Sequence, residues 1–137
     1  MLICNAEGMP FFSRSFDKFI DIEASLLSGL ISALATFGKQ LFDKEIATVY
    51  FGAPAEQTSS LFVITKDLIS QDQKIYFCFF SEGGCNHKLM TELATNLFIE
   101  IKNMFKANHP DFEAIKTKVN KIIDNRYQNI NQTGACS

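Results

Sequence analysis

The sequence is poor in the residue patterns that usually carry enzyme chemistry. It has two histidines and four cysteines in 137 residues, with neither a CxxC nor an HxxxH spacing, so a metal site is not indicated. Its serines lack the G-x-S-x-G pattern of a nucleophile elbow, and the phosphate-binding pattern G-x-x-x-x-G-K-[ST] is absent. We therefore predict a protein that is not an enzyme and that needs no cofactor or metal.

An excess of charge and long hydrophobic runs are also missing. The formal net charge is −2, with acidic and basic residues mixed along the chain, so nucleic acid is not an expected partner. The apolar stretch Met1–Cys4 reaches Asn5 and Glu7 far short of a signal peptide or a membrane span. We expect no direct membrane insertion, and a cytoplasmic protein whose cysteines are reduced thiols.

The chain does contain strand patterns and amphipathic helix patterns that follow one another closely. The strand patterns cover Leu2–Asn5, Met9–Ser15, Ile46–Phe51, Ser60–Thr65 and Lys74–Phe80, and the helix patterns cover Asp21–Phe42, Cys85–Phe105 and Pro110–Tyr127. The last two strands are apolar on both faces, which requires helices on both faces of the sheet. The order β-β-α-β-β-β-α-α predicts an α+β fold, in which a five-stranded, mainly antiparallel sheet carries one helix on one face and two on the other. Residues 1–127 are predicted to form one domain, and the polar residues 128–137 a disordered tail.

The first predicted helix carries more apolar surface than one sheet can cover. At about 100° per residue, its predicted core stripe consists of Leu27, Leu30, Ile31, Leu34, Gly38 and Leu41. One flank carries Leu26, Gly29, Ala33 and Phe37, and Ser25, Ser28, Ser32 and Thr36 continue round the back. Ser25, Gly29 and Ala33 are four residues apart, and such small residues allow another helix to approach closely. Two interpretations remain open: a partner packs on this flank, or the chain's own loops or termini cover it.

The segment Ser81–Lys88 is the one place where ligand chemistry is conceivable. It precedes a predicted helix, whose N-terminus favours a bound anion and a thiolate at Cys85. Glu82 opposes an anion, however, and a Gly-Gly turn followed by Asn86 as a helix cap accounts for the whole segment. A small-ligand sensor or enzyme that uses residues 81–88 is therefore kept as the alternative function.

Three stretches together resemble a known family. They are the opening ICNAEGMPFFSRSF, the helix core LLSGLISALATFGKQLF running into IATVYFG, and the later strand-to-helix joint. Up to about Tyr127 the chain resembles the longin-like domains of the wider longin and roadblock superfamily. The resemblance implies strand order 2-1-5-4-3, which places Leu2–Asn5 beside Lys74–Phe80 and leaves Ile46–Phe51 at an edge. Roadblock proteins begin with a helix, whereas this chain begins with a strand, which favours the longin type.

The resemblance also implies a function. Many members of the superfamily pair through the first helix and the third strand, which here are Ser25–Phe37 and Ile46–Phe51. We therefore expect a homodimer, or a heterodimer with a related domain, that serves as a platform for a small GTPase or a membrane-trafficking complex. The predicted partner-binding residues are Ser25, Leu26, Gly29, Ala33, Phe37, Thr48 and Tyr50. Cys4 and Cys78 lie on strands that this order makes neighbours, and we expect two buried thiols rather than a disulfide.

Overall fold

The structure is a computed structural model that describes residues 1–14, 23–52, 59–69, 72–82, 86–105 and 110–126. The strands are β1 (Leu2–Asn5), β2 (Pro10–Ser13), β3 (Thr48–Phe51), β4 (Ser59–Leu68) and β5 (Gln73–Glu82). The helices are α1 (Ala24–Phe42), α2 (His87–Ile101), the short 3₁₀ helix η2 (Lys102–Phe105) and α3 (Phe112–Arg126). The predicted tail, residues 128–137, lies outside the described residues.

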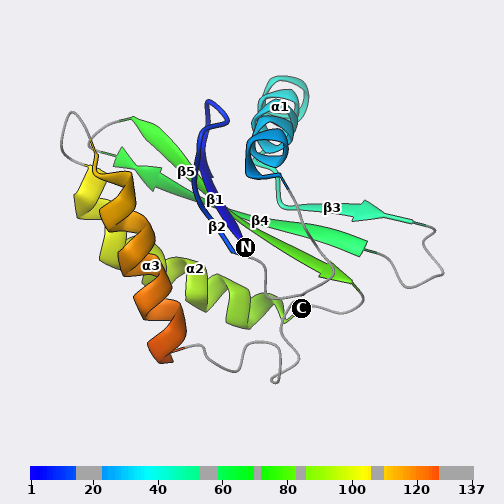
Figure 1. The fold of residues 1–137 in the computed structure, drawn as a ribbon. Coiled ribbons are helices and arrows are strands. Elements are labelled where there is room, and N and C mark those ends of the chain that lie inside the picture. The colour runs from blue at the N-terminus through cyan, green and yellow to red at the C-terminus, as the bar shows by residue number, and fades with distance from the viewer. Residues whose placement is uncertain (15–22, 53–58, 70–71, 83–85, 106–109, 127–137) are drawn as a thin grey trace.

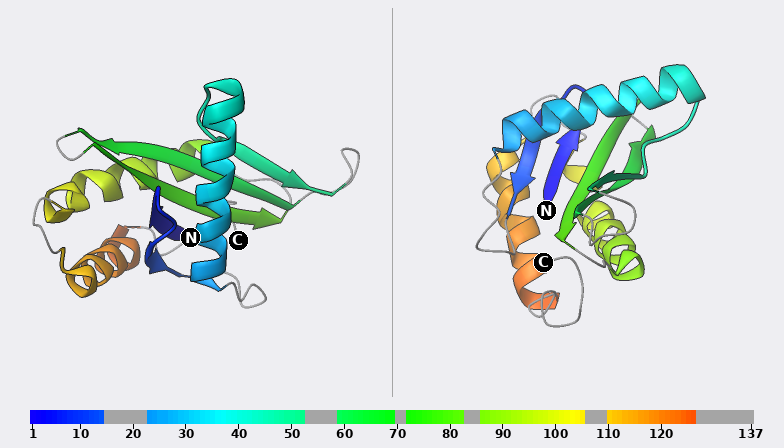
Figure 2. Two further views of the ribbon diagram at one scale, coloured as in Figure 1. Left: turned by 90° about the horizontal axis from the view of Figure 1, so that it is seen from above. Right: turned by 90° about the vertical axis from the view of Figure 1, so that its right-hand side faces the viewer.

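The five strands form one sheet in the order β2-β1-β5-β4-β3, and all neighbouring strands are antiparallel. Figure 1 shows α1 alone on one face of this sheet, with α2 and α3 on the other. The predicted α+β class, the strand order and the placement of the helices, which Figure 2 shows from two further sides, are therefore confirmed. Strand β3 forms one edge of the sheet and β2 the other.

The long hairpin of β4 and β5 is the centre of the fold because its side chains alternate between two cores. Ile75, Phe77 and Phe79 are buried among residues of α2 and α3, whereas Tyr76 and Cys78 are buried on the α1 side. Both cysteines of the central strands, Cys4 and Cys78, are buried free thiols, as expected. A hydrogen bond with Cys4, together with burial, raises the pKa of the Cys78 thiol.

The predicted core stripe of α1 is wrong in part, because the helix is rotated about its axis relative to the orientation that the sequence predicts. Leu27 and Ile31 are buried as predicted, but Ser28 and Ala35 are buried too, whereas Leu30 and Leu41 are exposed. Burial of a serine is tolerated here because the Ser28 hydroxyl donates a hydrogen bond to the Ala24 carbonyl at 2.6 Å.

A close contact with the β1–β2 hairpin explains this rotation. A Cβ atom built on Gly8, in the hairpin turn, would lie 3.3 Å from the Cα of Gly29 and 3.4 Å from the Ser28 carbonyl oxygen. Ser32 donates its hydroxyl hydrogen to the Ala6 carbonyl of the same turn. The small residues Ser28, Gly29 and Ser32 therefore let the turn approach α1, and a leucine at position 28 would hold it away.

Candidate interaction surface

A row of apolar side chains runs along the side of α1 that faces away from the sheet. We call it the outer stripe, and it consists of Leu26, Leu30, Ala33, Phe37 and Leu41. Its members follow one another at intervals of four, three, four and four residues, so they share an arc of about 80° on a helix that turns about 100° per residue. The exposed fractions of Leu26, Phe37 and Leu41 are 74%, 56% and 61%. An apolar row of this length on a surface helix is typical of a face that packs against another protein.

Gly29 lies beside the outer stripe and is open on its outward side. A Cβ atom built on Gly29 would meet no atom within 4 Å, and Ser25 and Ala33 next to it are exposed. The hairpin turn therefore touches the backbone of Gly29 but leaves the direction of a side chain free. The interpretation that the chain's own segments cover this flank applies to the Cα of Gly29 and to Ser28 and Ser32. Among the described residues, none covers Leu26, Phe37 or Leu41 of the outer stripe to the same extent.

The edge strand β3 presents main-chain groups away from the sheet. The N–H of Val63 donates to the carbonyl of Ala47 at 2.8 Å, so these directly opposed residues form a hydrogen-bonded pair. Such pairs alternate along antiparallel strands, so Val49 and Phe51 also point their main-chain groups at β4. Thr48 and Tyr50 consequently point theirs at the outer side of β3, where no other described strand pairs with it.

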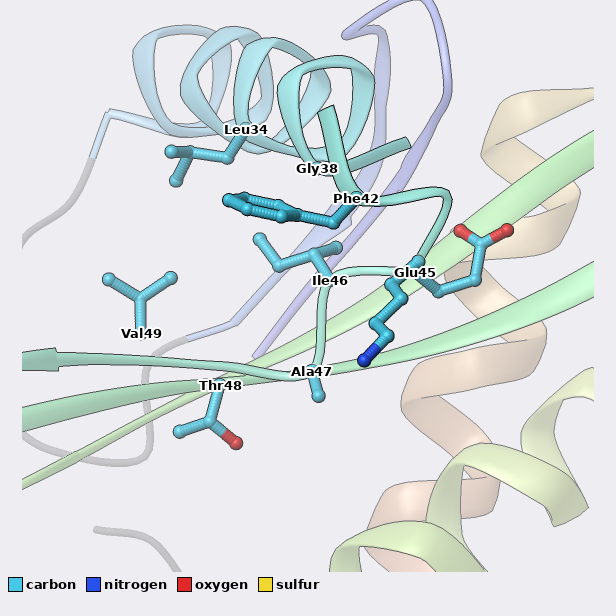
Figure 3. Close-up of a pocket in the computed structure, with 9 residues that line it drawn as sticks. Leu34, Gly38, Phe42, Glu45, Ile46, Ala47, Thr48 and Val49 are labelled. Carbon is cyan, nitrogen blue, oxygen red and sulfur yellow. The ribbon is translucent and has the colours of Figure 1, made fainter. Parts of the chain in front are cut away.

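A groove joins α1 to β3. It has a volume of about 410 Å³ and is lined mainly by Leu34, Gly38, Phe42, Ile46 and Val49. Figure 3 shows the side chains of Leu34, Phe42 and Ile46 turned toward one another between the helix and the strand. The groove is thus an apolar depression at the edge of the sheet.

The turn after α1 shapes this groove. Asp43 takes up a left-handed conformation with φ 52°, and its N–H and that of Lys44 donate to carbonyls of the last helical turn. Glu45 then forms an ion pair with Lys74 at 2.6 Å. This pair holds the segment between α1 and β3 against the sheet and raises the pKa of Lys74.

The outer stripe and the groove form one continuous apolar surface. The rings of Phe37, in the stripe, and Phe42, in the groove, meet edge to face with their centroids 6.5 Å apart. Phe42 and Phe51 are exposed by 65% and 48%, and they extend the surface toward the end of β3. We call the outer stripe, the groove and β3 together the α1–β3 surface.

The structure brings five of the seven predicted partner-binding residues together on one side of α1: Ser25, Leu26, Gly29, Ala33 and Phe37. Thr48 and Tyr50 pair with Phe62 and Ser60, and Phe62 packs into the core under α2, so their side chains lie on the other face of the sheet. They adjoin the α1–β3 surface through their outward main-chain groups, and their side chains are not part of it. This prediction missed Leu30, Leu41, Phe42 and Phe51, although the interval pattern from Leu26 to Leu41 is visible in the sequence.

The segment Ser81–Lys88 is described only at its two ends. The Asn86 side chain accepts the N–H of Leu89 at 3.1 Å, so the predicted helix cap is confirmed. The ring of His87 stacks on Phe62, with centroids 4.3 Å apart and an interplanar angle of 12°. Cys85 lies outside the described residues. Within the ranges that the structure describes, no three His, Cys, Asp or Glu side chains are grouped as a metal site would need.

Comparison of the chain with models of protein families, with curated proteins and with solved structures gives no match. In the described part of the chain, no helix combines the length and the apolar character that crossing a membrane would need.

Proposed function

We propose that this protein is a non-enzymatic interaction module that binds another protein through the α1–β3 surface. The observation that carries the proposal is the set of large apolar side chains exposed on this one edge of the molecule. They are Leu26, Leu30, Phe37, Leu41, Phe42 and Phe51. At about 200 Å² for a fully exposed residue of this size, their exposed fractions correspond to about 700 Å². That is close to the roughly 800 Å² that each partner contributes to a standard protein–protein interface.

Binding would combine two kinds of contact. The outer stripe has the spacing that packs ridges of one helix into the grooves of another, and Gly29 and Ala33 beside and within it allow a close crossing. The outward N–H and carbonyl groups of Thr48 and Tyr50 are available to a partner strand, which would extend the sheet across the interface. The helix supplies apolar area, and the strand supplies directional hydrogen bonds.

The class of partner follows from the resemblance to longin-like domains. The strand order that this resemblance implies agrees with that of the structure, which supports assigning the chain a similar role. The partner is then a related domain, with the pair serving as a platform for a small GTPase or a membrane-trafficking complex. The cytoplasm is the compartment where such partners act, and the free thiols of Cys4 and Cys78 suit it.

Two substitutions test the proposal without disturbing the chain's own fold. Gly29→Leu adds a side chain where a Cβ meets nothing within 4 Å, and Phe37→Ser removes a ring that is more than half exposed. Ile69→Ser is the matched control, because Ile69 is exposed by 90% but lies outside the α1–β3 surface. The readouts are light scattering after size exclusion, and binding to purified small GTPases loaded with GDP or with a GTP analogue.

We expect the first two variants to weaken association or GTPase binding at least tenfold, and the control to leave both unchanged. Circular dichroism melts should be alike for all three variants, which would show that the change lies in binding. If Gly29→Leu and Phe37→Ser keep the association and the GTPase binding of the unmodified chain, the proposal is wrong.

A further inference from the structure

We propose that Lys74 is a positioning residue for the α1–β3 surface. Its ammonium group clamps the segment that joins α1 to β3 onto the β4–β5 hairpin, and this clamp holds the groove in the form that a partner binds. We call this segment, residues 43–47, the link. The inference rests on the proposed function and adds a residue that regulates the α1–β3 surface from outside it. It is carried by the contacts of the link, by its few main-chain hydrogen bonds, and by the charges around Lys74.

The link is attached to two different strands of the sheet. The Ala47 carbonyl accepts the N–H of Val63, on β4, at 2.8 Å. Two residues earlier, a carboxylate oxygen of Glu45 lies 2.6 Å from the Nζ atom of Lys74, on β5. Lys74 does not line the groove, but Glu45, Ile46 and Ala47 do. The ion pair therefore ties one wall of the groove to a strand that is not part of the groove.

Little else holds the middle of the link in place. The two residues before Glu45 donate their N–H groups to carbonyls at the end of α1, and Ala47 accepts from Val63. Between these points, the main-chain groups of Glu45 and Ile46 make no hydrogen bond with any residue that the structure describes. Figure 3 shows the Ile46 side chain turned toward Phe42 and the Glu45 side chain on the other side of the link. The link is thus held by an apolar contact on one side and by the ion pair on the other.

The positive charge of Lys74 holds two carboxylates together. Asp67, which pairs with Lys74 across the β4–β5 hairpin, has a carboxylate oxygen 3.4 Å from the same Nζ atom. Without the ammonium group, the negative charges of Glu45 and Asp67 would face each other without a cation between them. Asp67 belongs to the hairpin and Glu45 to the link, so their repulsion would push the link away from the sheet. Neutralising Lys74 therefore releases the link and alters the groove.

Hydrogen exchange of single amides, followed by NMR, measures the release of the link in the isolated chain. The Val63 amide reports on the link because its hydrogen bond ends on Ala47. The Leu61 amide is the internal control. It lies two residues along the same strand, where Leu61 and Val49 form the next hydrogen-bonded pair of β3 and β4.

Three variants separate the clamp from a general effect of charge. Lys74→Met removes the ammonium group from a side chain of similar length, and Lys74→Arg keeps the positive charge. Asp67→Asn is the matched control, because it removes a carboxylate beside the same Nζ atom but on the hairpin rather than on the link. Each variant is also measured by light scattering and by binding to purified small GTPases loaded with GDP or with a GTP analogue. Phe37→Ser serves as the reference for loss of the α1–β3 surface itself.

We expect the Val63 amide of Lys74→Met to exchange about threefold faster than that of the unmodified chain, and the Leu61 amide at an unchanged rate. The effect is modest because the side chains of Glu45 and Lys74 are each exposed by 38%, and exposed ion pairs are weak. Association or GTPase binding should weaken about as much. Lys74→Arg and Asp67→Asn should leave exchange and binding unchanged. Because salt screens exposed charges, about 1 M sodium chloride should bring the Val63 rates of the unmodified chain and of Lys74→Met closer together.

Four outcomes would overturn the inference. They are an unchanged Val63 rate in Lys74→Met, equal acceleration at Val63 and Leu61, equal acceleration in Lys74→Arg or Asp67→Asn, and a released link that leaves binding unimpaired. In each case the proposed function stands as long as Phe37→Ser still abolishes binding. Binding that Phe37→Ser also leaves intact would instead refute the proposed function.

Discussion

Two glycines that meet at the contact between the β1–β2 hairpin and α1 should respond in opposite directions to the same substitution. Gly8 has φ +84°, a left-handed conformation, and a Cβ atom there would lie 3.3 Å from the Cα of Gly29. Gly29 is inside a helix, and a Cβ atom on it would meet nothing within 4 Å. Gly8→Ala should therefore destabilise the protein, and Gly29→Ala should stabilise it.

The magnitudes follow from these two environments. The left-handed backbone costs an L-residue about 1–2 kcal/mol, and moving the turn away from the helix adds about 1 kcal/mol or more. We therefore expect Gly8→Ala to lower the free energy of unfolding by about 2–3 kcal/mol, a large share of the ~5–15 kcal/mol typical of a domain. Gly29→Ala should raise it by up to about 1 kcal/mol, because alanine is the better helix former.

Urea denaturation followed by circular dichroism measures both effects. Both substitutions should be made in a Phe37→Ser background, so that any association through the outer stripe does not contribute to the measured stability. Equal m-values for the variants would show that the unfolded and folded states expose similar surface. If Gly8→Ala costs less than about 0.5 kcal/mol, or if Gly29→Ala destabilises, the hairpin does not pack on α1 as described.

Three further predictions concern stability. In a chain that begins at Met1, the terminal amine donates to the Arg14 carbonyl at 2.7 Å, and desolvation lowers its pKa from 8.0 to about 6. The unfolded state then binds the proton more tightly, so the free energy of unfolding should rise by about 2 kcal/mol from pH 6 to pH 8, and a flat denaturation profile would contradict this. Asn86→Ala should cost about 1 kcal/mol in thermal melts through loss of the α2 cap, whereas Asn125→Ala, on the exposed part of α3, should cost almost nothing. Leu97→Ala, at a fully buried position, should cost about 2–5 kcal/mol in urea denaturation, and a smaller loss would show that the core there is loosely packed.

Local patterns were sufficient to predict the elements and the layers of this fold. Continuous apolar runs identify β4 and β5 as strands buried on both faces, and helical spacing identifies α1, α2 and α3. The strand order came from the family resemblance, because nothing in the four residues Leu2–Asn5 states which strand they pair with. The predicted strands Ser60–Thr65 and Lys74–Phe80 are shorter than β4 and β5. At the turn between them, the polar residues Lys66 and Asp67 continue β4 and pair with Ile75 and Lys74.

The rotation of α1 could not be predicted from the helix alone, because it depends on a residue far away in the sequence. Leu30 and Leu41 are as apolar as Leu27, so a helical wheel cannot decide which of them faces the sheet. The choice is made where the turn at Gly8 meets Ser28 and Gly29, a contact that requires small residues on the side of the helix that packs inward. Contacts of this kind decide the orientation of a helix against its own apolar pattern. They cannot be predicted before the position of the β1–β2 hairpin is known.

The same rotation explains why the candidate surface exists. The sheet-facing side of α1 buries Leu27, Ser28, Ile31 and Ala35, so the large apolar side chains of the outer stripe are not needed to cover the sheet. Exposed in this way, they add little to the stability of the single chain and increase its tendency to associate. A protein that needed only to fold could carry serine or lysine at Leu26, Phe37 and Leu41 at almost no cost in stability. The apolar residues at these positions are therefore the ones on which the proposed interaction depends.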